Sequence, residues 1–214
     1  ISMEAAAAAA AELLGKNVVI APKNVAETTM DGICSTKTGT HLLANIRYQN
    51  AVNGKSSYIL QKQDAALVVS AMTGRPMPKD AHWDEVGLSA INEAVSQMFG
   101  ASVTALSSTF AKTFEMASPQ ILLAAVDERY LASVVGPDPL ITLTYTFSLE
   151  DQTESEILQI LPWSFAGELI NLILAPPVDD EEECEPSIPE FEMPEPLIET
   201  DESKSSEFTD STYD

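Results

Sequence analysis

The chain has few cysteines, few basic residues and no long apolar run. Its 2 cysteines, Cys34 and Cys184, are too few for a disulfide framework and have no metal-ligand spacing. They favour a reducing, cytoplasmic compartment. The alanine run near the start is too short for a membrane span and has no basic residues before it, which argues against a signal peptide. Lys and Arg total 11 against 33 acids, with no basic cluster, so binding to nucleic acid or to anionic membranes is disfavoured.

The excess of acidic charge lies mainly at the C-terminal end. Residues 178–214 hold fifteen acids and one lysine, a net charge of −14, whereas the preceding 177 residues hold eighteen acids and ten bases, a net charge of −8. Prolines are spread through the same end, and few apolar residues accompany them. Residues 176–214 are therefore predicted to be a disordered acidic linker or tail, and residues 1–175 to form the folded domain.

The folded part is predicted to contain two copies of one unit, each a helix, a strand ended by proline, two further strands and a helix. Copy one, residues 1–75, has helix 2–14 ended by Gly15, strand 17–21 before Pro22, strands 41–49 and 56–62 joined through Asn53-Gly54, and helix 63–73 ended by Gly74. Copy two, residues 82–175, has helix 84–109, strand 113–117 before Pro119, strands 140–149 and 155–161, and helix 164–174. Tyr58–Gln61 and Glu156–Gln159 match each other and support the duplication.

The predicted fold class is α+β. A single hairpin cannot bury its apolar face alone, so the two copies are expected side by side, in one antiparallel sheet covered by the two long helices. Residues 74–82, rich in proline and charge, are expected to connect the copies.

The long helix of the second copy has two distinct faces. At about 100° per residue, one narrow stripe contains Ser89, Glu93, Ser96 and Gly100. The opposite stripe is apolar enough to be buried and contains Leu88, Ile91, Val95, Met98, Ser102 and Leu106. The first stripe is typical of a docking or catalytic face, and an ordinary solvated helix face has the same composition.

These residues resemble a known family. The spacing Ser89-x3-Glu93-x2-Ser96-x22-Pro119 resembles the signature of the CheC, CheX and FliY phosphatases of bacterial chemotaxis, in which Asp or Ser is followed by Glu, Asn and a distant Pro. The stretch Ser155–Pro162 with Phe165-Ala166 is similar to the middle domain of the flagellar switch protein FliY. The resemblance covers roughly residues 1 to 175 and implies a pseudo-two-fold duplicated fold.

The resemblance implies dephosphorylation of the response regulator CheY. Glu93 would be the docking and positioning carboxylate, Ser96 would occupy the water-orienting place, and Ser89, Gly100 and Pro119 would be binding positions. The implied partners are phosphorylated CheY and switch proteins of the FliM and FliN type, at the cytoplasmic face of the flagellar basal body. No cofactor is expected, because Mg²⁺ would be carried by CheY.

Two departures leave the enzymatic role open. Ser96 stands where the family has Asn, and its shorter side chain would hold water in a different place. The Glu and Asn of the first copy would lie just before Ile1, so the sequence is expected to be a fragment without a complete site. Glu4 aligns with Gly100 at the crowded end of the helical face. The alternative is a non-catalytic scaffold of the flagellar switch that uses the same fold to bind its neighbours.

The remaining polar and aromatic residues are predicted to be structural. Asp127 and Glu128 are expected in a charged loop, and Asp84 at a helix start. Trp83 and Trp163 are expected in the core or an interface. His41 and His82 are isolated, and the sequence has neither a phosphate-binding glycine loop nor a nucleophile elbow.

Overall fold

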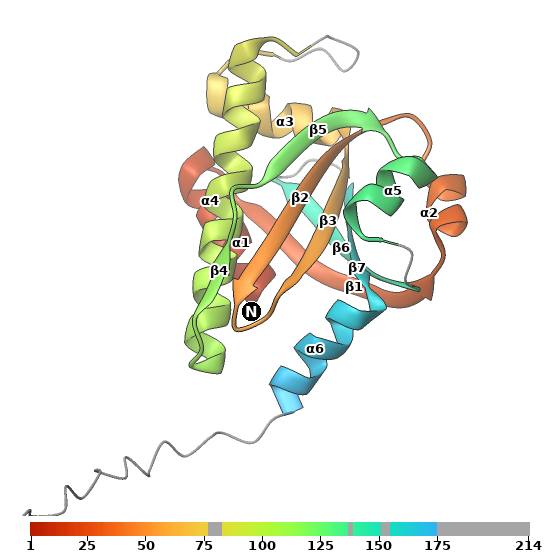
Figure 1. Cartoon of the computed structure of the whole chain (residues 1–214). Coiled ribbons are helices and arrows are strands. Elements are labelled where there is room, and N and C mark those ends of the chain that lie inside the picture. Colours follow the sequence, from red (N-terminus) through yellow and green to blue (C-terminus); the bar gives the residue numbers. More distant parts are fainter. Residues whose placement is uncertain (77–82, 137–138, 151–154, 175–214) are drawn as a thin grey trace, which may run out of the picture. The chain divides into compact units, whose positions relative to one another are not determined.

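A computed structural model describes residues 1–76, 83–136, 139–150 and 155–174 (Figure 1). The described residues belong to one compact unit, Ile1–Pro176. The acidic tail predicted to be disordered, most of the predicted connector and His82 lie outside the described residues.

The unit is built on one antiparallel sheet. Its strands run in the order β1-β6-β7-β3-β2-β4, and β5 also pairs with β2 beyond the end of β4. The strands are β1 (Val18–Thr28), β2 (Thr40–Asn50), β3 (Gly54–Gln61), β4 (Phe114–Met116), β5 (Gln120–Ala125), β6 (Leu140–Leu149) and β7 (Ser155–Pro162). The predicted α+β class and the antiparallel sheet are confirmed.

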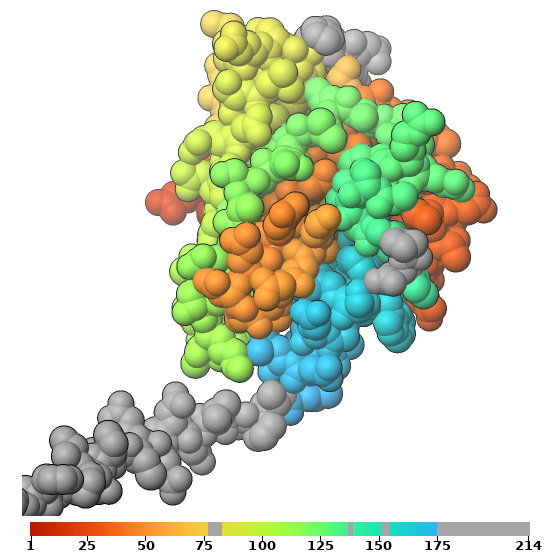
Figure 2. All heavy atoms as spheres, viewed as in Figure 1, coloured from red at the N-terminus to blue at the C-terminus, as the bar shows by residue number. Residues whose placement is uncertain are grey.

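Helices lie on both faces of this sheet. They are α1 (Ser2–Leu14), α2 (Met30–Thr36), α3 (Lys62–Thr73), α4 (Glu85–Phe110), α5 (Glu128–Val134) and α6 (Trp163–Leu174). The two long helices, α1 and α4, pack against each other as predicted, with α3 beside α4. The shorter α2 and α5 pack together over the opposite face. On this side the helices cover the strands only in part, and atoms of the β2–β3 hairpin (orange) reach the surface (Figure 2).

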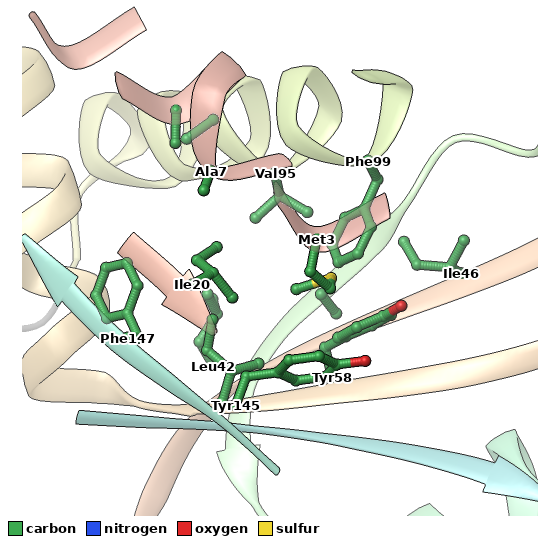
Figure 3. Packing of buried hydrophobic residues seen from close by; sticks show 14 of the residues in the cluster. Met3, Ala7, Ile20, Leu42, Ile46, Tyr58, Val95, Phe99, Tyr145 and Phe147 are labelled. Carbon is green, nitrogen blue, oxygen red and sulfur yellow. The ribbon is translucent and has the colours of Figure 1, made fainter. Parts of the chain in front are cut away.

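Two hydrophobic clusters hold the layers together. The larger one joins α1, α3 and α4 to the sheet, and Figure 3 shows Met3, Ala7, Val95 and Phe99 of the helices facing side chains of the strands. The smaller cluster lies under α2 and α5, whose Ile33 and Leu131 are almost fully buried, at 3 % and 0 % exposed. Both faces of β2 and β3 are therefore covered over part of their length, which explains the buried runs His41–Ala44 and Ser56–Ile59.

The two copies are interleaved and not merely side by side. The first strand of copy one, β1, pairs with β6 of copy two, and β4 and β5 of copy two pair with β2 of copy one. One backbone hydrogen bond between the copies accompanies each of these pairings. Ala51 N donates to Thr113 O at 3.0 Å, and Glu150 N donates to Asn17 O at 2.7 Å. We name β2 and β3 with β4 and β5 the first hairpin half, and β6 and β7 with β1 the second hairpin half.

The pseudo-two-fold axis passes between β3 and β7. β3 is followed by a helix at Lys62 and β7 by one at Trp163, an offset of 101 residues. Under this offset the register pair Tyr58–Gln159 maps onto itself. The predicted match of Tyr58–Gln61 with Glu156–Gln159 is wrong by three residues, which in a strand would exchange the two faces of the sheet.

Of the two strands predicted to end at a proline, the first continues beyond it and the second ends before it, as predicted. β1 runs through Pro22 to Thr28, with a register shift between Pro22 and Asn24. β1 lies at the edge of the sheet and has a neighbouring strand, β6, on one side only. A proline is tolerated there, because no strand on the outer side needs the N–H group that proline lacks. In the second copy, Pro119 separates β4 from β5, which both pair with β2.

Two short helices were not predicted. Asp127 was expected in a loop, but its carboxylate accepts a bond from Tyr130 N at 2.7 Å and caps α5, with Glu128 in the first turn. Thr29 caps α2 in the same way, accepting from Gly32 N at 3.2 Å. Each helix has 7 residues, too few for the apolar period of a helix to show.

The β2–β3 hairpin is confirmed, but its turn is not Asn53-Gly54. Tyr48 pairs with Gly54, which begins β3, and the chain reverses over the residues before it, where Asn50 has a φ of 72°. Gly54 is needed for another reason. A Cβ at this position would lie 2.0 Å from Cδ2 of Phe165, whose buried ring covers the strand.

Candidate functional site on helix α4

Helix α4 begins at a well-formed cap. Asp84 accepts a hydrogen bond from Gly87 N at 2.8 Å, which satisfies one of the free N–H groups of the first turn. Trp83, just before it, is 3 % exposed, as predicted for a core residue, whereas Trp163 is 52 % exposed. The cap and the buried indole fix the position at which α4 enters the fold.

The apolar face of α4 is buried largely as predicted. Ile91, Val95 and Ser102 are buried, and Met98 and Leu106 are half-buried against the core. Leu88 is the exception at 39 % exposed, because it lies in the first turn. This burial fixes the rotation of α4 about its axis.

The opposite face points to solvent, as the helical spacing predicts. Ser89, Glu93 and Ser96 are exposed, and Gly100 is half-buried. A Cβ at Gly100 would meet nothing within 4 Å, so this end of the face has room for a side chain or for a partner. The structure thus brings these four residues together on one accessible strip of α4.

A further residue of this strip was missed by sequence reasoning. Gln97 donates from Nε2 to Oε1 of Glu93 at 2.8 Å, so the amide holds the carboxylate in one orientation. The spacing of four residues on a helix was the available signal. The amide of Gln97 therefore lies beside Glu93, while Ser96 contributes only a hydroxyl.

Pro119 comes from a different element than the other predicted site residues. It lies half-buried between β4 and β5, and β4 contacts α4. Arg47 O accepts from Ala117 N at 3.0 Å, which anchors this segment to β2. The role of Pro119 at the site stays a prediction.

Small residues let α1 approach α4 closely. Met3, Ala6, Ala7 and Ala10 are the buried residues of α1, and Ala94 and Val95 are buried on α4. Alanine favours helix and allows two backbones to come close. Glu4, aligned in the sequence with Gly100, is exposed at the start of α1.

The described part of the chain contains no group of three or more His, Cys, Asp or Glu residues that could hold a metal ion. In the same part, no helix is long and apolar enough to cross a membrane. The polar groups that α4 offers are therefore a carboxylate, an amide and hydroxyls, which can orient water or bind a cationic side chain of a partner.

Comparison with known proteins supports the resemblance seen in the sequence. No family model matches the chain. The flagellar motor switch phosphatase FliY of Bacillus subtilis is 25 % identical over 200 residues, which cover 92 % of this chain and 53 % of that protein. The chain thus spans about half the length of the curated relative it matches.

Solved structures show the same fold. The FliY structure of Thermotoga maritima matches with a TM-score of 0.71 and 22 % identity, covering 80 % of this chain and 89 % of that one. The chain is thus similar to FliY in sequence and shares the fold of FliY and CheX. The FliM middle domain of Vibrio alginolyticus matches this FliY-like domain with a TM-score of 0.60 and 13 % identity, over 80 % and 94 % of the two chains. CheX of Vibrio vulnificus matches with a TM-score of 0.52 and 12 % identity, covering 75 % of this chain and 95 % of that one.

Proposed function

We propose that this FliY-like domain acts in the flagellar switch and chemotaxis system by dephosphorylating phosphorylated CheY. The observation that carries the proposal is the exposed strip of α4, where Glu93 is oriented by Gln97 and lies beside Ser96. The name of the curated relative, a flagellar motor switch phosphatase, supports the same activity. The domain would work at the cytoplasmic face of the flagellar basal body, together with switch proteins of the FliM and FliN type.

The proposed mechanism is positioning of a water molecule. Glu93 pairs with a lysine of the regulator and holds the two proteins in register. Ser96 and the amide of Gln97 bind a water in line with the acyl phosphate, whose bond to the regulator's carboxylate breaks as the water oxygen bonds to phosphorus. The proton of the water leaves with inorganic phosphate. The domain needs no metal of its own, because Mg²⁺ is carried by CheY.

A second function is favoured by one specific observation. Ser96 has no amide, and the fold is shared with the FliM middle domain, so the domain could instead be a non-catalytic scaffold that binds neighbouring switch proteins. A scaffold would bind regulator or switch protein without accelerating loss of phosphate.

The two functions are separated by a dephosphorylation assay with radiolabelled CheY. We expect Glu93→Ala to abolish the acceleration and Ser96→Asn to raise it, since the amide reaches farther than the hydroxyl. Glu115→Ala, which removes an exposed carboxylate of β4, is the matched control and should leave the rate unchanged. If the unaltered chain and Ser96→Asn both fail to accelerate phosphate loss, the phosphatase proposal is wrong and the scaffold remains.

A further inference from the structure

The sheet face opposite α1 and α4 carries a hollow of about 460 Å³ between the first hairpin half and α5. We name it the basic hollow. Its lining comes from β2, β3, β5, α5 and the segment between β4 and β5, and includes Asn45, Arg47, Lys55, Leu122, Tyr130 and Val134. It lies in a different part of the molecule from the outward face of α4, so it is a separate surface.

Two cations stand side by side in this hollow. Arg47 and Lys55 are register partners on β2 and β3, and directly opposed residues of antiparallel strands point to the same face of the sheet. Both are exposed, and neither forms an ion pair with any described residue. Like charges in this arrangement destabilise a hairpin, so the pair is unfavourable unless an anion lies between them.

The lining of the basic hollow contains no acidic residue, although the whole chain has 33 acidic and only 11 basic residues. An adjoining hollow of about 270 Å³ shares Lys55 and has Glu168 in its lining. Exposed Glu115 of β4 is the register partner of the lining residue Gln49 but does not itself line the basic hollow. The lining of the basic hollow thus carries two positive charges and no negative one, which favours a ligand with negative charge.

The floor of the hollow is rigid and polar. Tyr130 of α5 donates its hydroxyl proton to Asn45 Oδ1 at 2.6 Å, and its oxygen lies 2.7 Å from Ser57 Oγ. Burial raises the pKa of Tyr130, so the hydroxyl keeps its proton and the bond persists. Asn45 lies two residues before Arg47 on β2, so the two residues share one face of the sheet.

We propose that the basic hollow binds an acidic peptide segment of a partner protein, with carboxylates on Arg47 and Lys55. A peptide is favoured over a free small anion because Leu122, 48 % exposed, and half-buried Val134 offer apolar contact beside the charges. The cations themselves stand on long exposed side chains, which alone hold a small ion weakly. The planar guanidinium of Arg47 can bind a carboxylate through two parallel hydrogen bonds.

The second hairpin half shows what neutralises such a site. The pair equivalent to Arg47 and Lys55 is Thr146 and Glu156, which are register partners on β6 and β7. Glu156 accepts from Lys23 Nζ at 2.6 Å, so its charge is satisfied within the chain. An acid at the position of Lys55 is thus compatible with the fold.

The proposal is tested by fluorescence anisotropy of the whole chain with a labelled peptide of alternating Glu and Leu. We expect saturable binding that weakens with salt and is absent for the Gln–Leu version of the peptide. Arg47→Gln should weaken binding at least about tenfold, because it removes the charged guanidinium that binds the carboxylate. Lys55→Glu, which copies the other half, should abolish it.

Lys112→Gln is the matched control, because it removes one exposed positive charge that is not part of the lining of the basic hollow. It should leave the affinity within about twofold. Circular dichroism of each variant checks that the fold is kept. The proposal is overturned if the peptide does not bind, if Lys112→Gln weakens binding as much as Arg47→Gln, or if inorganic phosphate alone occupies the site as tightly as the peptide.

Discussion

The two hairpin halves share one backbone arrangement but have different side chains at equivalent positions. At the start of β3, Gly54 lies against the ring of Phe165. At the equivalent start of β7, Ser155 donates a hydrogen bond to Asp64, the residue equivalent to Phe165. The start of β3 thus packs on α6 through an aromatic contact, whereas the start of β7 joins α3 through a polar contact.

The same contrast separates the two outer surfaces. The first hairpin half leaves Arg47 and Lys55 together without an acid, whereas the second joins Lys23 to Glu156. After a duplication, positions that only hold the backbone can diverge freely, provided that each half stays packed. The difference between the halves can therefore be measured with variants at matched positions, on which the sheet register is the same.

The largest effect is expected from Gly54→Ala. Its Cβ would overlap the Phe165 ring at 2.0 Å, and the ring is buried and also stacks on Tyr48 with centroids 5.5 Å apart. We expect a loss of about 3 kcal/mol in the free energy of unfolding, measured by urea denaturation. Gly167→Ala is the control, because a Cβ there meets nothing within 4 Å and should stabilise helix α6 slightly. Equal stability of the Gly54 variant and the parent would show that the ring moves aside at no cost.

A smaller effect is expected at the equivalent position of the other half. Ser155→Ala removes the hydrogen bond to Asp64 but adds no atoms, and both residues are half-buried. The expected loss is about 1 kcal/mol in the same measurement. A loss as large as that of Gly54→Ala would mean that the polar contact holds its half as firmly as the aromatic one.

The smallest effect is expected from the exposed ion pair. The hydrogen bond from Lys23 lowers the pKa of Glu156, so the pair stabilises the fold above the unfolded pKa of this carboxyl and loses its effect as the pH falls through the lower folded value. Lys23→Gln should cost less than about 1 kcal/mol at neutral pH, because both side chains are partly exposed. The difference from the parent should vanish in acid. A difference that persists at low pH would contradict an electrostatic origin.

Sequence reasoning found the elements that carry strong local signals. α1 and α3 end where Gly15 and Gly74 adopt left-handed conformations, and α4 begins at the Asp84 cap. The outward face of α4, with Glu93 exposed, follows from the helical period alone. Nothing in the structure tests the chemical roles predicted for these site residues.

The missed features depend on contacts between distant parts of the chain. β1 continues past Pro22 because β6 pairs with it, although most of its later residues are exposed and show no apolar alternation. The basic hollow was not predicted, because the sequence suggested the wrong turn between β2 and β3. A two-residue turn at Asn53-Gly54 would have paired Lys55 with Val52, whereas the longer turn pairs it with Arg47. The cluster of cations becomes visible only in the correct register.

The exchange of first strands has a consequence for the origin of this fold. A polypeptide holding only one unit would leave its hairpin edge open and its leading strand without a neighbour, so it could complete its sheet only by assembling with a second identical molecule. Having both units in one chain makes that step intramolecular and independent of protein concentration. It also frees the two sequences to specialise, because they do not have to be the same.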